Sequence, residues 1–426
     1  MTIPPDIRKA LRIVIVSQCV GLIATLLFNN GFMLAYFSRL GLADHLILFL
    51  FALIPLVGMV LTLPLAFAAD RTGKKRMGGI GIVVSIAGFL MLVAAPFLPG
   101  LTVLLLTTGT LVFAAGNAAM GSSWFALLSP IVPEEIRGRW FGQMRTAWQM
   151  TGILFSLAVA VLFRWHSSLP LFQLILLICG LLLPVRLFLY MKIPELEPVH
   201  PSHDGFSRSL KAVFQIPGYL SFCAYIFLLS FMTGAVPGVL GLLEKGALGF
   251  NDSLLVVMGN LLSIGAIAGF LLGGKMVDRI GTKPVFLTGH VVFSATLAGI
   301  LLRGFIPLPT VVTIGGLAFL FGAIQGATGI ASTSELLALI PPENKSLSTG
   351  FNITLIAAGT SIAGLFSGQL LQLNVLHSEW TLFGQTLSEY DTILAGFMMM
   401  ILLIAVTLGL VPTIRHLRSQ WLPQNR

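Results

Sequence analysis

Two short groups of polar and helix-breaking residues interrupt long apolar runs of this sequence and have the chemistry to hold a ligand. Asn29 and Asn30 stand before Gly31 in the first run, and Thr233 stands four residues before Pro237 in a later run. Asn29 and Pro237 are 208 residues apart, which is also the spacing of a repeated motif described below. Polar groups in apolar surroundings mark a pathway or a binding site. The alternative role, hydrogen bonding between packed helices, is equally well supported.

One cationic and aromatic group could bind an anion. Arg145 and Gln149 are four residues apart and share one face of a helix, with Trp148 beside them. If that face turns inward, Arg145 would capture the anionic group and Trp148 would stack on it. We favour the other role, anchoring at the lipid headgroups, because Arg145 lies near the expected start of its helix. The remaining candidates for ligand contacts are polar or aromatic residues of other apolar runs: Asn117, Ser122, Trp124, Gln325, Thr328 and Asn352.

The sequence offers no residue pattern typical of an enzyme or a metal centre. Cys19, Cys179 and Cys223 fall in apolar segments without C-x-x-C spacing, which is typical of small buried hydrophobes. His200 and His203 lie in a proline-rich stretch with no nearby cysteine, which favours a solvated loop over a metal site. A nucleotide-binding P-loop and a nucleophile–base set are both missing. We therefore predict no catalytic residue, no metal and no cofactor.

The composition is that of a membrane protein. Of 426 residues, 56% are hydrophobic and only 10% are charged, and the mean hydropathy is +0.95. Soluble domains carry about 25% charged residues. The lipid bilayer is thus the expected solvent. The net charge of +9 is explained by cationic cytoplasmic loops, and no nucleic-acid partner is expected.

A span needs about twenty mostly apolar residues. By this rule we expect an all-α polytopic membrane protein with twelve transmembrane helices. The expected helices cover residues 11–37, 46–69, 79–98, 101–128, 143–163, 169–191, 216–242, 253–275, 284–303, 309–338, 347–373 and 391–413.

Lysine and arginine are unevenly divided between the two sides of this arrangement. If both termini are cytoplasmic, 21 of the 25 fall on that side, including Arg186. Only Arg39, Arg164, Lys245 and Arg303 fall on the outer side. Because cationic loops stay inside during insertion, this asymmetry predicts two cytoplasmic termini. The N-terminus shows no cleavable signal, so we expect the first helix to remain as a span of the plasma (inner) membrane.

A charged motif occurs twice. The pattern D-R-x-G-x-K begins at Asp70 after the second expected helix and again at Asp278 after the eighth, an offset of 208 residues. A proline–glutamate pair repeats at Pro133 and Pro342 with an offset of 209. Two signatures with nearly one offset indicate a duplicated six-helix unit. We expect an N-terminal six-helix bundle over residues 1–191, a cytoplasmic linker over 192–215 and a C-terminal bundle over 216–426.

With these motifs the sequence resembles the major facilitator superfamily (MFS) of secondary transporters over essentially its whole length. The resemblance implies two pseudo-symmetric six-helix bundles, a cavity lined by helices 1, 4, 7 and 10, and transport of a small solute by alternating access. In similar proteins the motif acid lies against the opposite half and holds the cytoplasmic side closed. The residues expected to act in gating are Asp70, Arg71, Gly73, Lys74, Asp278, Arg279, Gly281, Lys283 and Glu335.

Substrate and coupling are left open by the sequence. The fifth expected helix lacks the glycine- and proline-rich motif of drug antiporters, and Pro194–Glu195 matches the sugar-porter pattern only in part. Glu335 is the one acid inside an expected span away from its ends, where we expect it to pair with Arg279 or Lys345. Proton coupling, sodium coupling, exchange and facilitated diffusion are all compatible with a monomeric transporter of this kind. The alternative is a transporter-like sensor or assembly factor without transport.

Overall fold

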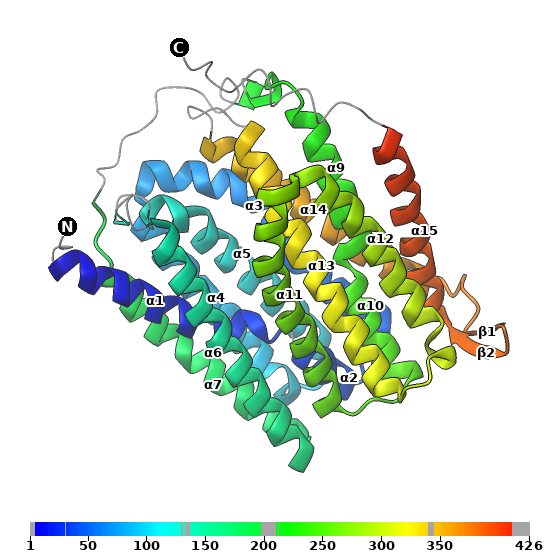
Figure 1. Cartoon of the computed structure of the whole chain (residues 1–426). Coiled ribbons are helices and arrows are strands. Elements are labelled where there is room, and N and C mark those ends of the chain that lie inside the picture. Colours follow the sequence, from blue (N-terminus) through cyan, green and yellow to red (C-terminus); the bar gives the residue numbers. More distant parts are fainter. Residues whose placement is uncertain are drawn as a thin grey trace. The chain divides into compact units, whose positions relative to one another are not determined.

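The computed structural model of the chain describes residues 5–29, 31–128, 131–132, 137–196, 210–211, 213–339 and 345–410. These residues are almost entirely helical, with one two-stranded antiparallel hairpin (Figure 1). The helices of the first half are α1 (Pro5–Leu26), α2 (Phe32–Arg39), α3 (Asp44–Thr72), α4 (Lys74–Ala94), η1 (Ala95–Phe97), α5 (Thr102–Leu128), α6 (Arg137–Trp165) and α7 (Leu169–Met191). The second half contains α9 (Tyr219–Gly234), α10 (Val236–Leu242), the π-helical turn η3 (Leu243–Ala247), α11 (Asp252–Ile280), α12 (Thr282–Leu301), η4 (Arg303–Phe305), α13 (Thr310–Leu339), α14 (Lys345–Gln372), β1 (Glu379–Leu382), β2 (Gln385–Ser388) and α15 (Glu389–Leu410).

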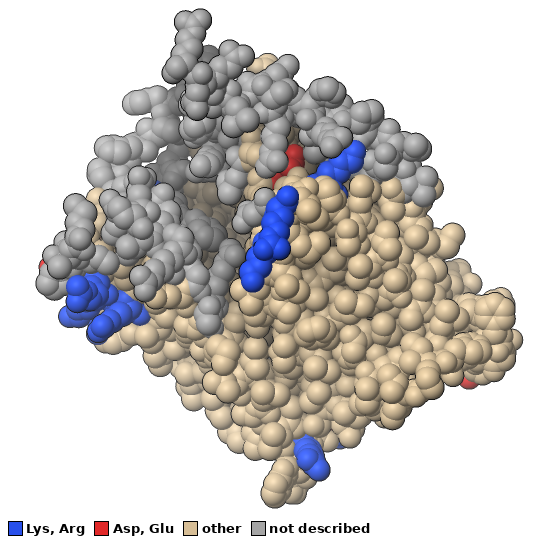
Figure 2. Space-filling model, in the orientation of Figure 1, with Lys and Arg blue, Asp and Glu red and all other residues tan. Residues whose placement is uncertain are grey.

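The helices have the length and the apolar surfaces of membrane-spanning helices. In the described part of the chain, 11 helical segments are long and apolar enough to cross a membrane by length and composition. α15, with 22 residues, supplies the twelfth expected helix. Large apolar side chains such as Leu154, Leu181 and Phe188 are exposed on the helix surfaces. The face seen in Figure 2 is mostly uncharged over the described residues. The predicted class, an all-α polytopic membrane protein, is confirmed.

Two expected spans are discontinuous in the structure. α1 ends at Leu26 and α2 begins at Phe32, with Gly31 between them in the left-handed region at a φ of 79°. α9 ends at Gly234 and α10 begins at Val236. Pro237 lacks the N–H that would continue the hydrogen-bond ladder of α9, which explains this second break. The polar and helix-breaking residues noted in the sequence therefore coincide with real interruptions.

Other boundaries differ from those expected. α6 begins at Arg137, six residues before the predicted start at residue 143, so Arg145 lies two turns inside the helix. α3 and α4 run almost into each other, and only Gly73 separates them, so the first charged motif occupies helix ends instead of an open loop. The hairpin β1–β2 lies in a segment expected to be irregular. Its turn, Phe383–Gly384, has two residues with positive φ, which suits a tight hairpin.

The described chain forms two compact units. Unit 1 contains residues 1–260 and 339–376, and unit 2 contains residues 261–338 and 377–426. Unit 1 brings segments from both repeats together, because α3 packs along α14. There, Ser361 Oγ donates to the carbonyl oxygen of Ala52 at 2.9 Å. The division expected from the sequence, into bundles 1–191 and 216–426, follows the internal repeat and not these two units. It stays a prediction.

Small residues let helices approach closely in each unit. In unit 1 a Cβ on Gly88 of α4 would overlap the backbone nitrogen of Phe113 in α5. In unit 2 a Cβ on Gly265 of α11 would overlap the carbonyl oxygen of Phe319 in α13. Lipid gives no hydrophobic drive for helices to associate, so close backbone packing of this kind holds membrane helices together.

Candidate functional site

The break between α1 and α2 carries the first pair of predicted ligand contacts. Asn29 is exposed, and its Nδ2 donates to the carbonyl oxygen of Thr25 at 3.3 Å. Asn30 lies outside the described residues. A Cβ on Gly31 would stand 2.6 Å from the carbonyl oxygen of Leu255 in α11, so the break sits tightly against a helix of the second repeat within unit 1. Discontinuous helices of this kind form substrate sites in repeat-built transporters.

The equivalent break between α9 and α10 is more fully packed. Thr233 is buried, and its Oγ1 donates to the carbonyl oxygen of Leu229 at 2.8 Å. A Cβ on Gly234 would stand 2.6 Å from Thr360 Oγ1 in α14. The hydroxyl of Thr233 is therefore satisfied within its own helix.

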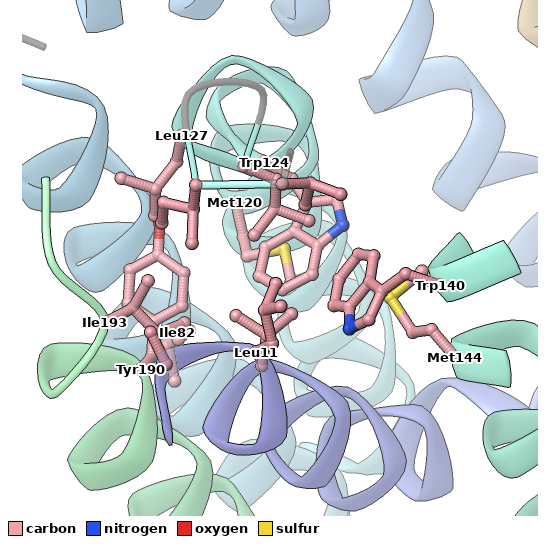
Figure 3. Packing of buried hydrophobic residues seen from close by; sticks show 14 residues of the cluster. Leu11, Ile82, Met120, Trp124, Leu127, Trp140, Met144, Tyr190 and Ile193 are labelled. Atoms are coloured by element: carbon pink, nitrogen blue, oxygen red, sulfur yellow. The ribbon is translucent and has the colours of Figure 1, made fainter. Parts of the chain in front are cut away.

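The predicted ligand-contact residues of α5 differ in whether their polar atoms already have hydrogen-bond partners. Ser122 Oγ donates to the carbonyl oxygen of Ala119 at 2.9 Å. Trp124 is buried and stacks on Tyr190 of α7, with ring centroids 6.2 Å apart (Figure 3). The Nδ2 of Asn117 is buried and has no hydrogen-bond partner among the described residues. Of the three, Asn117 has the unfilled hydrogen-bonding capacity that a ligand could use.

The other predicted contacts are distributed over several helices. On α6, Trp148 and Gln149 are half-buried, and the side chain of Arg145 lies outside the described set. On α13, Thr328 donates to the carbonyl oxygen of Ile324 at 2.9 Å. Gln325, also on α13, is half-buried. On α14, Asn352 Nδ2 lies 3.7 Å from Cys223 Sγ of α9 and helps these two helices pack.

The first charged motif is held by an acid from the segment that follows α7. Gly73 has a φ of 100°, as a tight reversal between α3 and α4 requires. The Oε1 of Glu195 accepts hydrogen bonds from the backbone nitrogens of Lys74 at 2.7 Å and Lys75 at 3.3 Å. A carboxylate at a helix N-terminus satisfies free N–H groups and complements the helix dipole. The side chains of Asp70 and Arg71 lie outside the described residues.

The second motif has the same turn but a different partner. Gly281 has a φ of 85° between α11 and α12. Within unit 2, Glu335 of α13 accepts a hydrogen bond from Thr282 Oγ1, and Arg279 is exposed. The expected pairing of Glu335 with Arg279 or Lys345 stays a prediction. Lys283 is half-buried, and the side chains of Asp278 and Lys345 are not among those described.

Asp252 in unit 1 is an ion-pair centre that the sequence reasoning missed. Its side chain is fully buried at the start of α11. Arg39 at the end of α2 approaches its Oδ2 at 2.7 Å, and Lys245 of η3 approaches its Oδ1 at 2.6 Å. Arg39 also donates to Ser167 Oγ at 2.6 Å. The group Arg39, Lys245 and Asp252, called the outer clasp below, joins residues 213 positions apart.

Unit 2 holds a second buried pair. Arg303 and Asp391 form a bidentate salt bridge. Nη1 donates to Oδ1, and Nη2 donates to Oδ2 at 3.1 Å. Asp391 also accepts hydrogen bonds from the backbone nitrogen and Oγ of Ser388, each at 2.8 Å. Three of the four cations predicted to lie on the outer side, Arg39, Lys245 and Arg303, thus bind buried acids. In the sequence, these cations stood out because they fall on the side that carries few lysines and arginines. This was the one available indication that they have acidic partners.

Comparison with known proteins identifies the family. The family model described as "Major Facilitator Superfamily" matches residues 16–364. The chain belongs to the major facilitator superfamily. No curated protein sequence matches it.

Solved MFS-fold transporters share the architecture at low identity. A variant of the nucleoside transporter NupG is 16% identical with a TM-score of 0.70, covering 95% of this chain and 99% of its own. A bacterial homologue of the iron transporter ferroportin in an inward-facing state is 12% identical with a TM-score of 0.71, covering 94% and 98%. A D-xylose-proton symporter is 10% identical with a TM-score of 0.70, covering 95% and 98%. At these identities the likeness establishes the fold.

As an MFS member, the chain is a membrane transporter of small solutes and not an enzyme. Two further buried ionisable residues of this transporter escaped the sequence reasoning. Glu244 lies in the π-helical turn η3 just past the expected end of the seventh helix and is 3% exposed. Arg186 was counted with the cytoplasmic cations although the expected helix 169–191 covers it; in the structure it lies inside α7 and is buried.

Proposed function

We propose that this transporter moves its solute by alternating access in which the outer clasp opens and closes the outer side. The supporting observation is that Asp252, a buried carboxylate, is bound by cations from α2 and η3, which belong to different repeats. Alternating access requires contacts between repeats that form in one state and break in the other.

Neighbouring contacts support closure at the same place. Ser253 Oγ, next to Asp252, donates to the carbonyl oxygen of Ala160 in α6 at 2.8 Å. A Cβ on Gly241 of α10 would stand 2.6 Å from Leu34 of α2. Along α3 and α14, Gly368 would place a Cβ 3.1 Å from the carbonyl oxygen of His45. All of these contacts lie within unit 1 and join the first repeat to the second.

The solute-binding and gating residues of the transporter are part of the proposal. Solute contacts are assigned to Asn29 and Asn30 at the first helix break and to Asn117 on α5. Thr233, Thr328 and Asn352 are weaker candidates, because they are buried and their donors already bond to groups of the protein. Asn29 also bonds to Thr25 but is exposed. The charged motifs that begin at Asp70 and Asp278 are assigned to the inner gate.

Coupling and orientation complete the proposal. Glu244 is the assigned coupling residue, since ionisable groups buried in spans mark ion pathways. In this proposal the protein lies in the plasma membrane with both termini in the cytoplasm. It works as a monomer.

The gating role is tested by substituting Asp252→Asn. This change leaves Arg39 and Lys245 without their counter-charge and should loosen the outer end. A cysteine introduced as Val256→Cys, one turn further along α11 at a fully buried position, reports the opening. We expect a membrane-impermeant maleimide to label it several-fold faster in the Asp252→Asn background.

A matched control is Arg164→Gln, which removes an exposed outer cation that has no ion-pair partner among the described residues. It should leave the labelling rate of Val256→Cys unchanged. The chain without Val256→Cys gives the background labelling of the native cysteines Cys19, Cys179 and Cys223, which is subtracted. Equal labelling of Val256→Cys in the presence and absence of Asp252→Asn would reject the clasp as a gate.

The transport itself is tested in liposomes. The purified chain should drive saturable uptake of at least one member of a panel of small metabolites, measured with imposed proton or sodium gradients. With a transported solute in hand, Glu244→Gln should abolish the effect of the gradient and retain solute exchange. No flux and no saturable binding for any panel member would instead favour the sensor role.

A further inference from the structure

We infer that Arg186 forms an oxyanion-binding subsite inside the first repeat, so that the transported solute carries a carboxylate or phosphate group. This inference rests on the proposed transport function and specifies the charge of its substrate. It begins from a cation buried among helices of unit 1, with no acid beside it in the part of the chain that the structure describes. Arg186 lies on α7, five residues before the helix ends, and is 5% exposed.

The guanidinium of Arg186 is poorly satisfied. Its described hydrogen bond runs from Nη2 to the sulfur of Met120 at 3.4 Å, and sulfur is a weak acceptor. Its Nε has no partner in the described part of the chain. No carboxylate among the described residues pairs with it, and Glu195, nine residues further on, is occupied at the N-terminus of α4. A guanidinium stays charged at neutral pH, so burial without an anion is costly.

The fold makes room for this cation. Gly21 of α1 lies directly beside it, and a Cβ at that position would overlap the Nε. Any other residue at position 21 would therefore exclude the guanidinium from the space between α1, α5 and α7. Ionisable residues placed inside membrane bundles generally mark a site or a pathway.

Two more polar side chains lie near Arg186. Tyr190 is one helical turn beyond Arg186 on α7 and fully buried, and its hydroxyl has only the hydroxyl of Ser123 close to it. Its ring stacks on Trp124 (Figure 3), while the nearby Ser123 hydroxyl is directed to the carbonyl oxygen of Met120 at 3.2 Å. Asn117, three residues before Met120 and hence on the same face of α5, has an unpartnered Nδ2.

A buried cation with no acid among the described residues, beside the side-chain donors of Asn117 and Tyr190, predicts a ligand that brings negative charge and several acceptor atoms. A carboxylate or phosphate has both, and a guanidinium binds such groups in a fork geometry. An uncharged sugar or nucleobase would supply acceptors but leave the charge of Arg186 uncompensated. The shared chemistry is therefore an oxyanion, either on a free solute or on a lipid headgroup.

The test is the thermal stability of the purified full-length chain in neutral detergent at constant ionic strength. The probes are inorganic phosphate, succinate and a short-chain phosphatidylglycerol, with chloride, a pentose and an uncharged nucleoside as comparisons. We expect a saturable rise in melting temperature with phosphate or succinate. The rise should need at least about tenfold more probe, or vanish, in Arg186→Gln, because a charge-assisted partner is lost.

Matched variants separate the subsite from general surface charge. Lys192→Gln removes an exposed cation just beyond the end of the same helix, 4.0 Å above the Phe188 ring, and should keep the full response. Tyr190→Phe keeps the stack on Trp124 and removes only the hydroxyl, so it should weaken the response several-fold. If Arg186→Gln cannot be recovered folded, Tyr190→Phe and Gly21→Ala, which displaces the guanidinium, carry the same test.

The outcomes separate this inference from the transport proposal. A response to phosphatidylglycerol alone that needs Arg186 assigns the subsite to a lipid headgroup and overturns its assignment to the transported solute. A neutral probe that stabilises wild type and Arg186→Gln equally, and is taken up by liposomes, keeps transport and overturns the oxyanion subsite. Oxyanion binding that needs Arg186 without any flux keeps the subsite and removes transport. Equal oxyanion responses in wild type and Arg186→Gln, or no response to any oxyanion, also overturn it.

Discussion

At the scale of single residues, this transporter concentrates its charge chemistry in a few buried groups. Asp252 and Asp391 each have side chains with no exposed surface and are each bound by arginine. Arg186 differs from these two, because it is buried without an acid among the described residues. A buried pair is stable only when both members are present, since removing one leaves an uncompensated charge.

The pair Arg303–Asp391 gives a direct test of this principle. Asp391→Asn should destabilise the protein by about 3 kcal/mol, because Arg303 is almost fully buried and would lose its counter-charge. The anchoring of Ser388 at the end of β2 should weaken as well. Chemical denaturation in detergent, followed by tryptophan fluorescence, measures the free energy of unfolding. A loss below about 0.5 kcal/mol, as expected for the exposed Arg164→Gln control, would contradict the prediction.

At the scale of elements, helix breaks and close helix contacts define what can move and what cannot. α1/α2 and α9/α10 break at equivalent places in the two repeats, which supplies backbone groups and hinges near the proposed site. The helix pairs α4–α5 and α11–α13 instead approach through glycines and act as rigid blocks. Motion is therefore expected at the breaks and at the clasp, and not within these pairs.

The rigid pair α11–α13 can be tested with two glycines of the same helix. Gly265→Ala should destabilise the protein by about 1–3 kcal/mol, because the added methyl overlaps the carbonyl oxygen of Phe319. Gly274→Ala, nine residues further along α11, meets nothing within 4 Å and should be neutral or slightly stabilising. Melting temperatures of the two variants provide the comparison. Equal effects would show that close packing here contributes little.

At the scale of the whole molecule, the repeats and the charge asymmetry predict a defined orientation. Fluorescent protein fused to the C-terminus should fold and fluoresce in the cytoplasm. Cysteines introduced at Arg164 and at Phe383 should react with impermeant reagent added outside intact cells, since both residues are exposed. A cysteine introduced at Lys9 should react only after the membrane is permeabilised. The reverse pattern of labelling would invert the proposed topology.

The membrane class, the twelve helices, the repeat and the two glycine turns were readable from sequence, because each depends on local properties. A span depends on the summed hydropathy of about twenty residues, and a positive φ depends on one glycine. The family follows from two short motifs at one spacing. The helix breaks were also visible, since Gly31 and Pro237 act on their own backbone.

Partners across the fold could be decided only by tertiary structure. Arg39 and Asp252 are 213 residues apart, and the sequence gives no reason to pair them rather than assign each to a loop. Thr233 and Asn352 looked available for a ligand, but their donors already bond to neighbours. Arg186 fell inside an expected helix and was counted as a cytoplasmic cation, but only the packed helices show that it is buried. Burial and pairing are properties of the space between helices, and hydropathy along one helix does not contain them.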